Sequence, residues 1–431
     1  MNILFISKDL SGGDLCVRLQ NEGHKGRLFV DDKNNNQNYL GMVEKTGDWR
    51  SQLDWVGKDG LVVVDSLGYG KIQDELRAQG YSVVGGSDFA DRLEDERQYG
   101  QKIMSALGIE VVPSGEFDSP EKAIKFVQEN EGPWVLKQNG HIDKIFNYVG
   151  RMQDGSDVVA ILESYCQHNR AECARIDLQK KIEGVEIGVA RYFNGHDWVG
   201  PIELNIEHKD LHAGGVGPKT YEMGTLLWYE ENEANKLFQT MLAPFKPYLQ
   251  KIQFKGDIDV DCIVNEDGVY PLEITPRFGW PSTHLHTELH LSPWGDFLKA
   301  VADGKPYDLK YKKGYSIAVL VATPPFPYQI SEKKYSPVGE RIYFHSDMTA
   351  DDLSHLHFED VSKDEQGNFY ISGESGFVLH VTAEGETVEA AREKAQKIID
   401  KIVIPKMFYR NDIGLKFMNE DQQKLKQWGW I

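Results

Sequence analysis

The sequence predicts an α/β protein with an N-terminal parallel-sheet domain, a central domain and a small C-terminal α+β domain. Strand and helix signals alternate from residue 1 to about residue 88, which is typical of a parallel sheet whose strands are joined by helices. Two extended runs flank a tight acidic turn, at 260–264 and 269–279, and predict a β-hairpin. Further strands and one long helix follow residue 304 and predict a last module.

The chain is long enough for about three domains, since it has 431 residues. Apolar residues make up 40% and charged residues 27%, an ordinary globular composition without an apolar run that would span a membrane. Cys16, Cys166, Cys173 and Cys262 are too few for a disulfide framework, so a reducing cytoplasm is expected. The net charge of −19 argues against a surface that binds nucleic acid.

The elements are predicted from apolar runs, glycine turns and helical periodicity. In the first part we expect strands at 2–7, 60–65 and 81–84, a turn at 11–14, and helices at 15–21 and 71–79. In the central part we expect a long polar helix at 89–106, a strand at 110–113, a helix at 120–130 and strands at 134–137 and within 175–207. In the last part we expect strands at 316–321, 369–371 and 377–382 and a helix at 388–402.

The acidic hairpin is the most informative stretch. Asp261 lies on its first strand and Glu273 on its second, so the two carboxylates are expected on facing strands near one end. Such hard oxygen ligands suit Mg²⁺ that carries a nucleoside triphosphate, and Arg277 would neutralise phosphate charge beside the metal. The alternative is a solvated acidic hairpin, but charges that interrupt an apolar strand pair need a partner, and a metal would supply one.

Three cations are candidates for binding phosphate. Lys137 closes an apolar strand, and Lys144 lies in the glycine-containing loop that follows it. Arg97 is expected at the centre of the helix 89–106, where pairing with the acidic residues at 94–96 is the usual alternative. An ordinary surface position is the alternative for both lysines.

Two further segments have the composition of a binding site. The extended stretch 178–186 would present backbone groups to an adenine edge, and Glu186 would accept hydrogen bonds from ribose hydroxyls, unless it only faces solvent. The stretch 208–224 is rich in glycine, which lets backbone approach a ligand closely. Both a substrate loop and an inert surface loop remain open there.

Several motifs, in this order, resemble the ATP-grasp superfamily and specifically the phosphoribosylamine–glycine ligase (glycinamide ribonucleotide synthetase) family. The resemblance extends over the whole chain, and its C-terminal set is absent from other ATP-grasp enzymes. The motifs are Gly85-Gly86-Ser87 with Leu93-Glu94 and Arg97, Gly217-Pro218-Lys219-Thr220 with Met223-Gly224, Leu272-Glu273 with Arg277-Phe278-Gly279, Val378-Leu379-His380-Val381-Thr382-Ala383, and Arg410-Asn411-Asp412-Ile413-Gly414.

The resemblance implies how the chain divides. A pre-ATP-grasp domain would span 1–88, an ATP-grasp domain 89–303 and a C-terminal domain 304–431. Within the ATP-grasp domain, 89–115 would be a helical entry, 116–182 a lid subdomain and 183–303 the catalytic sheet.

The resemblance also implies the cofactors and the site residues. ATP and Mg²⁺, or Mn²⁺ in its place, would be bound. The residues expected to contact ATP are Arg97, Lys137, Lys144, the backbone from Lys180 to Ile182, and Glu186. The metal ligands would be Asp261, Glu273 and Thr275, and the catalytic residues Arg277 and Lys209. The substrate contacts would be Gly13, Gly86, Ser87, Gly217, Pro218 and Thr220.

The implied reaction joins a small-molecule carboxylate to an amine. ATP phosphorylates the carboxylate, the amine attacks the acyl phosphate, and ADP and phosphate leave, which requires positioning and charge neutralisation more than a protein nucleophile. No nucleic-acid or membrane partner is expected, and the chain is expected to be a monomer or a weak dimer.

The chain departs from the family where the amine and amino acid should bind. The family's Gly-Gly-Arg-Glu-His motif is Gly12-Gly13-Asp14-Leu15-Cys16, its metal asparagine is Thr275, and its Asp-Pro-Glu is Trp280-Pro281-Ser282. We therefore expect a retained ATP site with an altered substrate pocket. A catalytically weakened nucleotide sensor or scaffold is the main alternative, and modification of a nucleotide or a nucleic-acid base is a third.

Overall fold

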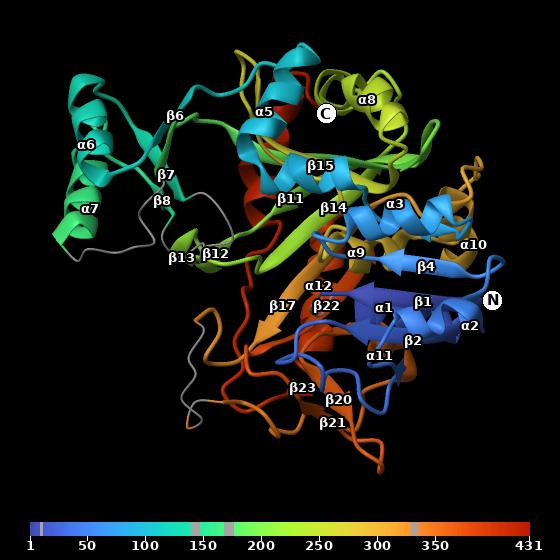
Figure 1. Ribbon diagram of the computed structural model, residues 1–431. Coiled ribbons are helices and arrows are strands. Elements are labelled where there is room, and N and C mark those ends of the chain that lie inside the picture. The colour runs from blue at the N-terminus through green and yellow to red at the C-terminus, as the bar shows by residue number, and fades with distance from the viewer. Residues whose placement is uncertain (9–11, 139–146, 168–175, 329–333, 335) are drawn as a thin grey trace.

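The computed structural model describes residues 1–8, 12–138, 147–167, 176–328, 334 and 336–431. It contains an N-terminal sheet, a long central sheet and a projecting lid (Figure 1). The predicted α/β fold class with a parallel-sheet N-terminal domain is confirmed.

The N-terminal sheet is parallel and has the strand order β3-β2-β1-β4-β5. Its central strands are apolar runs that are buried along their length, because helices and the rest of the protein cover both faces. The strands are β1 (Asn2–Ser7), β2 (Lys25–Val30), β3 (Glu44–Lys45), β4 (Leu61–Val64) and β5 (Val83–Val84). The helices are α1 (Gly12–Asn21), α2 (Leu53–Val56) and α3 (Gly70–Ala78).

The central sheet has eight strands among the described residues, in the order β16-β15-β10-β11-β14-β17-β22-β19, and every neighbouring pair is antiparallel. Its first five strands are β16 (Val269–Thr275), β15 (Lys255–Val264), β10 (Val185–Asn194), β11 (Trp198–Glu207) and β14 (Gly224–Glu230). Its last three are β17 (Tyr315–Ala322), β22 (Phe377–Gly385) and β19 (Leu356–Phe358). The sheet therefore continues across residue 304, since β14 pairs directly with β17.

The remaining elements surround this sheet. Helices α8 (Lys246–Lys251), α9 (Ser282–Leu289), α10 (Trp294–Ala302), α11 (Ala350–Ser354), α12 (Val388–Ile399) and α13 (Gln422–Gln427) follow in chain order. Three small two-stranded sheets pair β12 (Asp210–His212) with β13 (Val216–Lys219), β18 (Tyr343–Phe344) with β23 (Ile402–Val403), and β20 (Val361–Lys363) with β21 (Phe369–Ile371).

The lid projects from the body of the molecule, as Figure 1 shows. Its antiparallel sheet has the order β6-β9-β7-β8 and packs against two helices that share a small core of their own. The elements are β6 (Ser114–Phe117), α6 (Pro120–Glu129), β7 (Trp134–Gln138), β8 (Tyr148–Val149), α7 (Ser156–Gln167) and β9 (Ile176–Lys180).

Two sequence predictions between the N-terminal sheet and the lid are wrong. The single helix expected at 89–106 is two helices, α4 (Asp88–Asp95) and α5 (Arg97–Ala106), because Glu96 leaves the helical region with φ −109° and ψ 85°. The break places Arg97 at the start of a helix rather than at its centre. The strand expected at 110–113 begins later, at Ser114.

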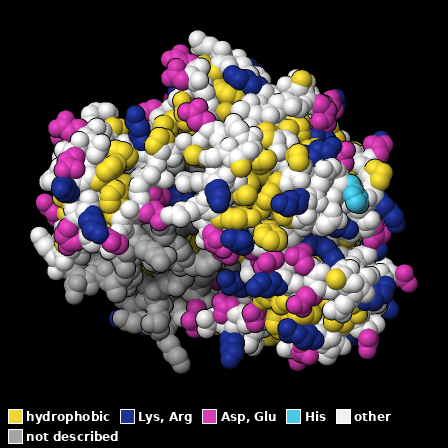
Figure 2. Space-filling model, turned by 45° about the horizontal axis from the view of Figure 1, so that its top comes forward, with side chains coloured by type: hydrophobic (Ala, Val, Ile, Leu, Met, Phe, Trp, Pro, Cys, Tyr) yellow, Lys and Arg dark blue, Asp and Glu magenta, His cyan; other side chains and the backbone are white. Residues whose placement is uncertain are grey.

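The surface and the length of the helices bear on the choice of partners. In the part of the chain that the structure describes, no helix is both long and apolar enough to cross a membrane. On the face shown in Figure 2, basic and acidic side chains are interspersed. That face therefore offers no broad field of one sign.

The N-terminal domain is joined to the central sheet through a close backbone contact. The Gly85 amide donates a hydrogen bond of 2.8 Å to the Lys255 carbonyl. A Cβ atom on Gly256 would lie 1.9 Å from the Gly85 carbonyl oxygen, so only glycine fits between β5 and β15. One core cluster also combines residues of β1 and α1 with residues of α10, β17 and β22.

We expect Gly256→Ala to force these strands apart and to lower the free energy of unfolding by about 2 kcal/mol or more, because the clash is with backbone. Urea denaturation followed by circular dichroism measures this change. Gly47→Ala is the matched control, since no atom lies within 4 Å of its Cβ position, and it should change stability by less than about 0.5 kcal/mol. Equal stability of the two variants would contradict the close-packed junction.

Candidate active site

The two hairpin carboxylates lie on the same face of the central sheet. Asp261 on β15 is the register partner of Glu273 on β16, and Thr275 is the partner of Asp259. Directly paired residues of neighbouring strands point to the same side, so the four side chains form one polar patch. Asp261 is buried and Glu273 is half exposed.

Lys209 lies among four carboxylates of this patch. Its Nζ is 2.6 Å from Glu207, 3.1 Å from Glu273, 3.7 Å from Asp261 and 3.8 Å from Glu186. Burial by itself would lower the pKa of Lys209, but the carboxylates, Glu207 first, raise it well above its ordinary value. The four carboxylates thus stabilise the charged form of the Lys209 side chain.

More buried acids surround the patch than the sequence analysis identified. Burial, followed by Glu207, raises the pKa of Asp261 and of Glu222 well above their ordinary values. Burial, followed by Glu203, likewise raises the pKa of Asp259 well above its ordinary value and that of Asp257 to about 7. The alternation of aspartates at 257, 259 and 261 was the missed signal, because residues two apart on a strand share a face.

This donor set fits a hard divalent cation such as Mg²⁺ or Mn²⁺, which prefers carboxylate oxygens. Asp261 and Glu273 supply them from facing strands. The buried oxygens Glu222 Oε1 and Asp259 Oδ1 have no hydrogen-bond donor among the described residues. Added positive charge at the patch would therefore offset repulsion between the acids.

Two cations lie close together where α5 meets the lid sheet, Arg97 on α5 and Lys137 on β7. Arg97 Nε is 2.8 Å from Asp177 on β9, and its Nη2 donates to Gln179 at 3.1 Å. Lys137 on β7 is the register partner of Asp177. Burial, then the charge of Arg97, lowers the pKa of Lys137 to about 8, although Glu273 acts in the opposite direction.

This pair of like charges is the arrangement expected around a bound anion. The partners Asp177 and Gln179 were not identified in the sequence. They lie far along the chain from Arg97 and reach it only through the lid sheet. The predicted phosphate contact Lys144 falls outside the described residues.

The predicted adenine hinge connects the lid to the central sheet. The Lys180 amide donates to the Pro113 carbonyl at 3.2 Å, and the Lys181 amide donates to Pro133 at 3.0 Å. Ile182 follows them, half buried, and Glu186 is exposed on β10 with its carboxylate turned toward Lys209. The N–H of Lys180 is therefore used inside the protein.

Arg277 and the Gly86-Ser87 segment both lie near the end of β16. Arg277 Nη2 is 2.9 Å from Glu94 Oε1 on α4, and its Nη1 donates to the Phe278 carbonyl. A Cβ atom on Gly86 would lie 3.4 Å from the Pro276 carbonyl oxygen. The Ser87 hydroxyl accepts a hydrogen bond from the Ala90 amide and caps α4, so this side chain has a structural role.

The glycine-rich stretch 208–224 is held in place by the C-terminal motif. Asp412 Oδ2 accepts from the Gly214 amide at 2.8 Å, and Arg410 donates to the Asp210 carbonyl at 2.8 Å. Thr220 donates to the Lys209 carbonyl through both its amide and its hydroxyl. Thr220 therefore positions Lys209, whereas Gly217 is exposed and Pro218 is half exposed in β13.

The predicted substrate residue Gly13 lies apart from this patch. It is buried on α1, and a Cβ atom there would lie 2.1 Å from the ring of Tyr39. Gly13 thus allows an aromatic ring to pack onto the helix.

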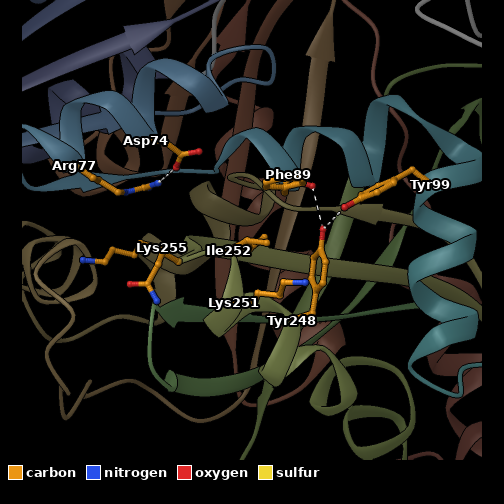
Figure 3. A pocket seen from close by; sticks show the side chains of 9 residues that line it. Asp74, Arg77, Phe89, Tyr99, Tyr248, Lys251, Ile252 and Lys255 are labelled. Atoms are coloured by element: carbon orange, nitrogen blue, oxygen red, sulfur yellow. Dashed lines mark hydrogen bonds and ion pairs between the residues drawn. The ribbon is translucent and has the colours of Figure 1, made fainter.

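A cavity of about 580 Å³ opens elsewhere, between α3, the pair α4–α5 and α8 (Figure 3). Among the side chains that line it are Arg77, Phe89, Tyr99 and Tyr248. None of the predicted site residues lines this cavity, so the carboxylate patch and the cavity are distinct features.

Comparison with known proteins agrees with this geometry. Residues 305–416 match the family model described as "Phosphoribosylglycinamide synthetase, C domain". The phosphoribosylamine–glycine ligase of Clostridium acetobutylicum is 26% identical over 364 residues, which is 80% of this chain and 81% of that protein. The enzyme of the same name from Streptomyces coelicolor is 24% identical over 355 residues, 80% of each chain.

Solved structures share the fold. The phosphoribosylamine–glycine ligase of Thermotoga maritima superposes with a TM-score of 0.72 at 18% identity and covers 96% of this chain and 100% of its own. A biotin carboxylase of Campylobacter jejuni, solved with a β,γ-ATP ligand, gives a TM-score of 0.63 at 14% identity and covers 99% and 98%. The predicted resemblance to phosphoribosylamine–glycine ligases is confirmed.

We expect Lys209→Met to leave the carboxylates of the patch unpaired and to lower the free energy of unfolding by about 3 kcal/mol at pH 7.5. Because burial and the neighbouring carboxylates raise the pKa values of Asp259 and Asp261, these groups take up protons as the pH falls toward 5, so the variant should regain stability there, and added Mg²⁺ should also restore part of it. Urea denaturation across this pH range measures both effects. Lys310→Met, at an exposed ion pair with Asp308, is the control and should lose less than about 1 kcal/mol. If the free energy of unfolding of Lys209→Met is lowered by the same amount at every pH, repulsion among the carboxylates is not the cause.

Proposed function

We propose that this chain is an ATP-dependent carboxylate–amine ligase that forms an amide through an acyl phosphate. The observation that supports this most is the opposition of two sets of charges. Asp261 and Glu273 form a carboxylate pair on the central sheet, while Arg97 on α5 and Lys137 on the lid form a cation pair. A triphosphate with its divalent ion requires both.

The chain's own residues would divide the work by charge. Asp261, Glu273 and Thr275 would hold Mg²⁺ or Mn²⁺, which when bound neutralises phosphate charge. Lys137 on β7 and Arg97 on α5 would bind the phosphates. The backbone at Ile182 would bind the adenine, and Glu186 would bind the ribose. Arg277, already fixed by Glu94, would stabilise the charge that develops on the transferred phosphoryl group.

The Lys209 side chain would move when a metal ion binds, because the ion would be attracted to the same carboxylates that now hold its ammonium group. Its Nζ lies 3.7 Å from Asp261 and 3.1 Å from Glu273, two of the three proposed metal ligands, so the ion and the lysine would compete for the same oxygens. Displaced toward the phosphates, Lys209 would contribute its charge to the transfer.

The substrates are proposed by chemical class. The relatives are named phosphoribosylamine–glycine ligases, which supports an amino acid such as glycine as the acid and an amine of a sugar phosphate or nucleotide. We also propose that the pocket for the amine or the acid differs from theirs. Asp14 stands where the family motif has arginine, so the positive charge that would attract a substrate phosphate is absent at this position.

A catalytically weakened nucleotide sensor is the second candidate. The occupation of the carboxylate patch by Lys209 favours it. Against it, the chain retains many buried acids that are costly without a bound cation.

We propose a cytoplasmic location and a monomer or weak dimer. The free thiols of Cys16, Cys166 and Cys262 support a reducing compartment. Cys173 lies outside the described residues.

The first test is ADP release by Glu273→Gln. This variant keeps the shape of the side chain but removes a ligand charge, so ADP formation should fall by at least about 100-fold while the fold is retained. Glu266→Gln, on the exposed turn of the same hairpin, is the matched control and should be as active as the parent. If Glu273→Gln forms ADP at the same rate as the parent protein, the proposed metal site is not needed for this reaction, and the nucleotide sensor would be favoured instead.

The same assay addresses the substrates. ADP release is measured with Mg-ATP over amino acids crossed with amines, including glycine with phosphoribosylamine. Turnover of that pair above about 1 per second would contradict the altered pocket and leave the ligase itself supported.

The second test uses the lowered pKa of Lys137. Since this pKa is about 8, the side chain is charged at pH 7 and becomes neutral above that value, so affinity for Mg-ATP should weaken by up to about tenfold per pH unit above 8. Titration calorimetry from pH 7 to 9.5 measures the affinity. Lys137→Arg stays charged throughout this range, so its affinity should be flat. The same slope in both proteins would exclude Lys137 as its origin.

A further inference from the structure

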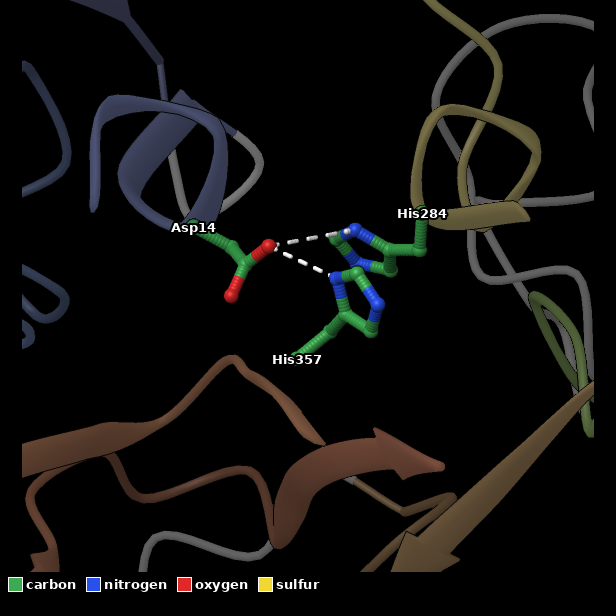
Figure 4. Close-up of side chains that lie close together, drawn as sticks. All are labelled: Asp14, His284 and His357. Atoms are coloured by element: carbon green, nitrogen blue, oxygen red, sulfur yellow. Dashed lines mark hydrogen bonds and ion pairs between the residues drawn. The ribbon is translucent and has the colours of Figure 1, made fainter. Parts of the chain in front are cut away.

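A second cluster of ionisable side chains, separate from the carboxylate patch, lies where three parts of the fold meet. Asp14 on α1, His284 on α9 and His357 on β19 converge on one point, as Figure 4 shows. All three are buried, with exposed fractions of 2%, 1% and 0%. None of the three is among the residues proposed to bind ATP or its metal ion.

The distances within the cluster suit a set of ligands. Asp14 Oδ2 is 2.7 Å from His357 Nδ1 and 3.6 Å from His284 Nδ1, and one ligand atom from each residue lies within 4.8 Å of the others. Tetrahedral zinc with bonds of 2.0–2.2 Å separates its ligand atoms by about 3.3 Å. The two measured distances bracket that value.

Both ring nitrogens of His357 face oxygen atoms. Its Nε2 faces the hydroxyls of Thr382 at 3.0 Å and Thr287 at 3.5 Å. Thr382 donates its one proton to Glu288, and Thr287 donates to the His284 carbonyl. Both hydroxyls are therefore acceptors toward Nε2, and Asp14 Oδ2, 2.7 Å from Nδ1, is an acceptor as well. A neutral His357 has one proton for these two sides, so one of its ring nitrogens turns a lone pair toward an acceptor.

His284 has the same arrangement. Its Nε2 is 2.8 Å from Glu359 Oε1, and a carboxylate only accepts. The proton of neutral His284 is therefore on Nε2. The lone pair on His284 Nδ1 then faces Asp14 Oδ2, and with its proton on Nε2 His357 would turn a second lone pair toward the same oxygen, so that three electron-rich atoms would converge at one buried point.

A cation resolves this convergence. Ligating histidines commonly donate their other ring N–H to a carboxylate or another acceptor, which fixes the tautomer, and both histidines have such an acceptor at Nε2 here. The Arg18 guanidinium, 3.3 Å from Asp14 Oδ2, approaches the same oxygen but carries no bond to the histidines' Nδ1 atoms. Two imidazoles and one carboxylate are borderline ligands that suit Zn²⁺ and related ions better than Mg²⁺.

We propose that Asp14, His284 and His357 bind one divalent transition-metal ion of the Zn²⁺ type. The ion would join the first helix of the N-terminal domain to α9 and to the edge strand of the central sheet. Glu359 and Thr382 would orient the two histidines, and a fourth position would be left to a small ligand such as water. The site is structural, and its occupancy does not depend on ATP.

The experiment measures metal content directly. The full chain is produced without a histidine tag, stripped with a chelator, dialysed against Zn²⁺ or Co²⁺ in excess Mg²⁺, and freed of loose ions. Plasma mass spectrometry should then find about one transition-metal ion per chain, and Co²⁺ should give the visible absorption of a low-coordinate site. The loaded protein should unfold at a higher temperature than the stripped protein.

Variants locate the ion. Asp14→Asn and His284→Gln should each lose at least nine-tenths of the bound metal. His286→Gln is the matched control, because His286 is equally buried on the same helix beside the carboxylate of Glu203, and it should keep the ion. Glu273→Gln should keep it as well, which separates this site from the carboxylate patch.

Two results would overturn the proposal. If the folded parent protein retains no Zn²⁺ or Co²⁺ after dialysis, protons rather than a metal hold the cluster together. If His284→Gln retains as much metal as His286→Gln, the ion is bound elsewhere. The parent measurement decides the matter even where a variant fails to fold, which gel filtration and near-ultraviolet circular dichroism would reveal.

Discussion

Repulsion among buried carboxylates is the constraint on which the centre of this molecule depends. Strand alternation places the acids of β15 on one face, and the neighbouring strands add Glu207 and Glu273 to them. Burial, followed by the neighbouring carboxylates, raises the pKa of Asp259 and of Asp261 well above their ordinary values, so positive charge stabilises the patch. Lys209 supplies that charge in the free protein.

Much of the surrounding structure serves to keep Lys209 in that place. Thr220 fixes its backbone carbonyl, and the tight hairpin of β12 and β13 is tied to the C-terminal segment through Asp210 and Asp412. An isolated bridge between Phe408 and Ala322, the last residue of β17, joins this C-terminal segment to the central sheet. The last third of the chain thus supports the central patch across the sheet.

The two ionic clusters of the protein differ in their chemistry. The patch around Lys209 contains carboxylates and an ammonium group and is open toward the lid, which suits a hard ion that arrives with a ligand. The cluster around Asp14 contains imidazoles and is closed, which suits an ion that stays. The same electrostatic problem, a buried excess of electron-rich atoms, is met in two ways.

The sequence by itself determined the parallel N-terminal sheet, the acidic hairpin and the family resemblance, because these depend on local apolar runs, turns and motif spacing. It did not determine the break at Glu96, since a helical pattern continues through it and the break serves a contact between Arg97 and Asp177 in the lid sheet. Nor did it reveal that Lys209 meets four carboxylates or that Asp14 meets His284 and His357. Those contacts join residues that are distant in the chain, and only strand pairing and the packing of helices bring their side chains to the same point.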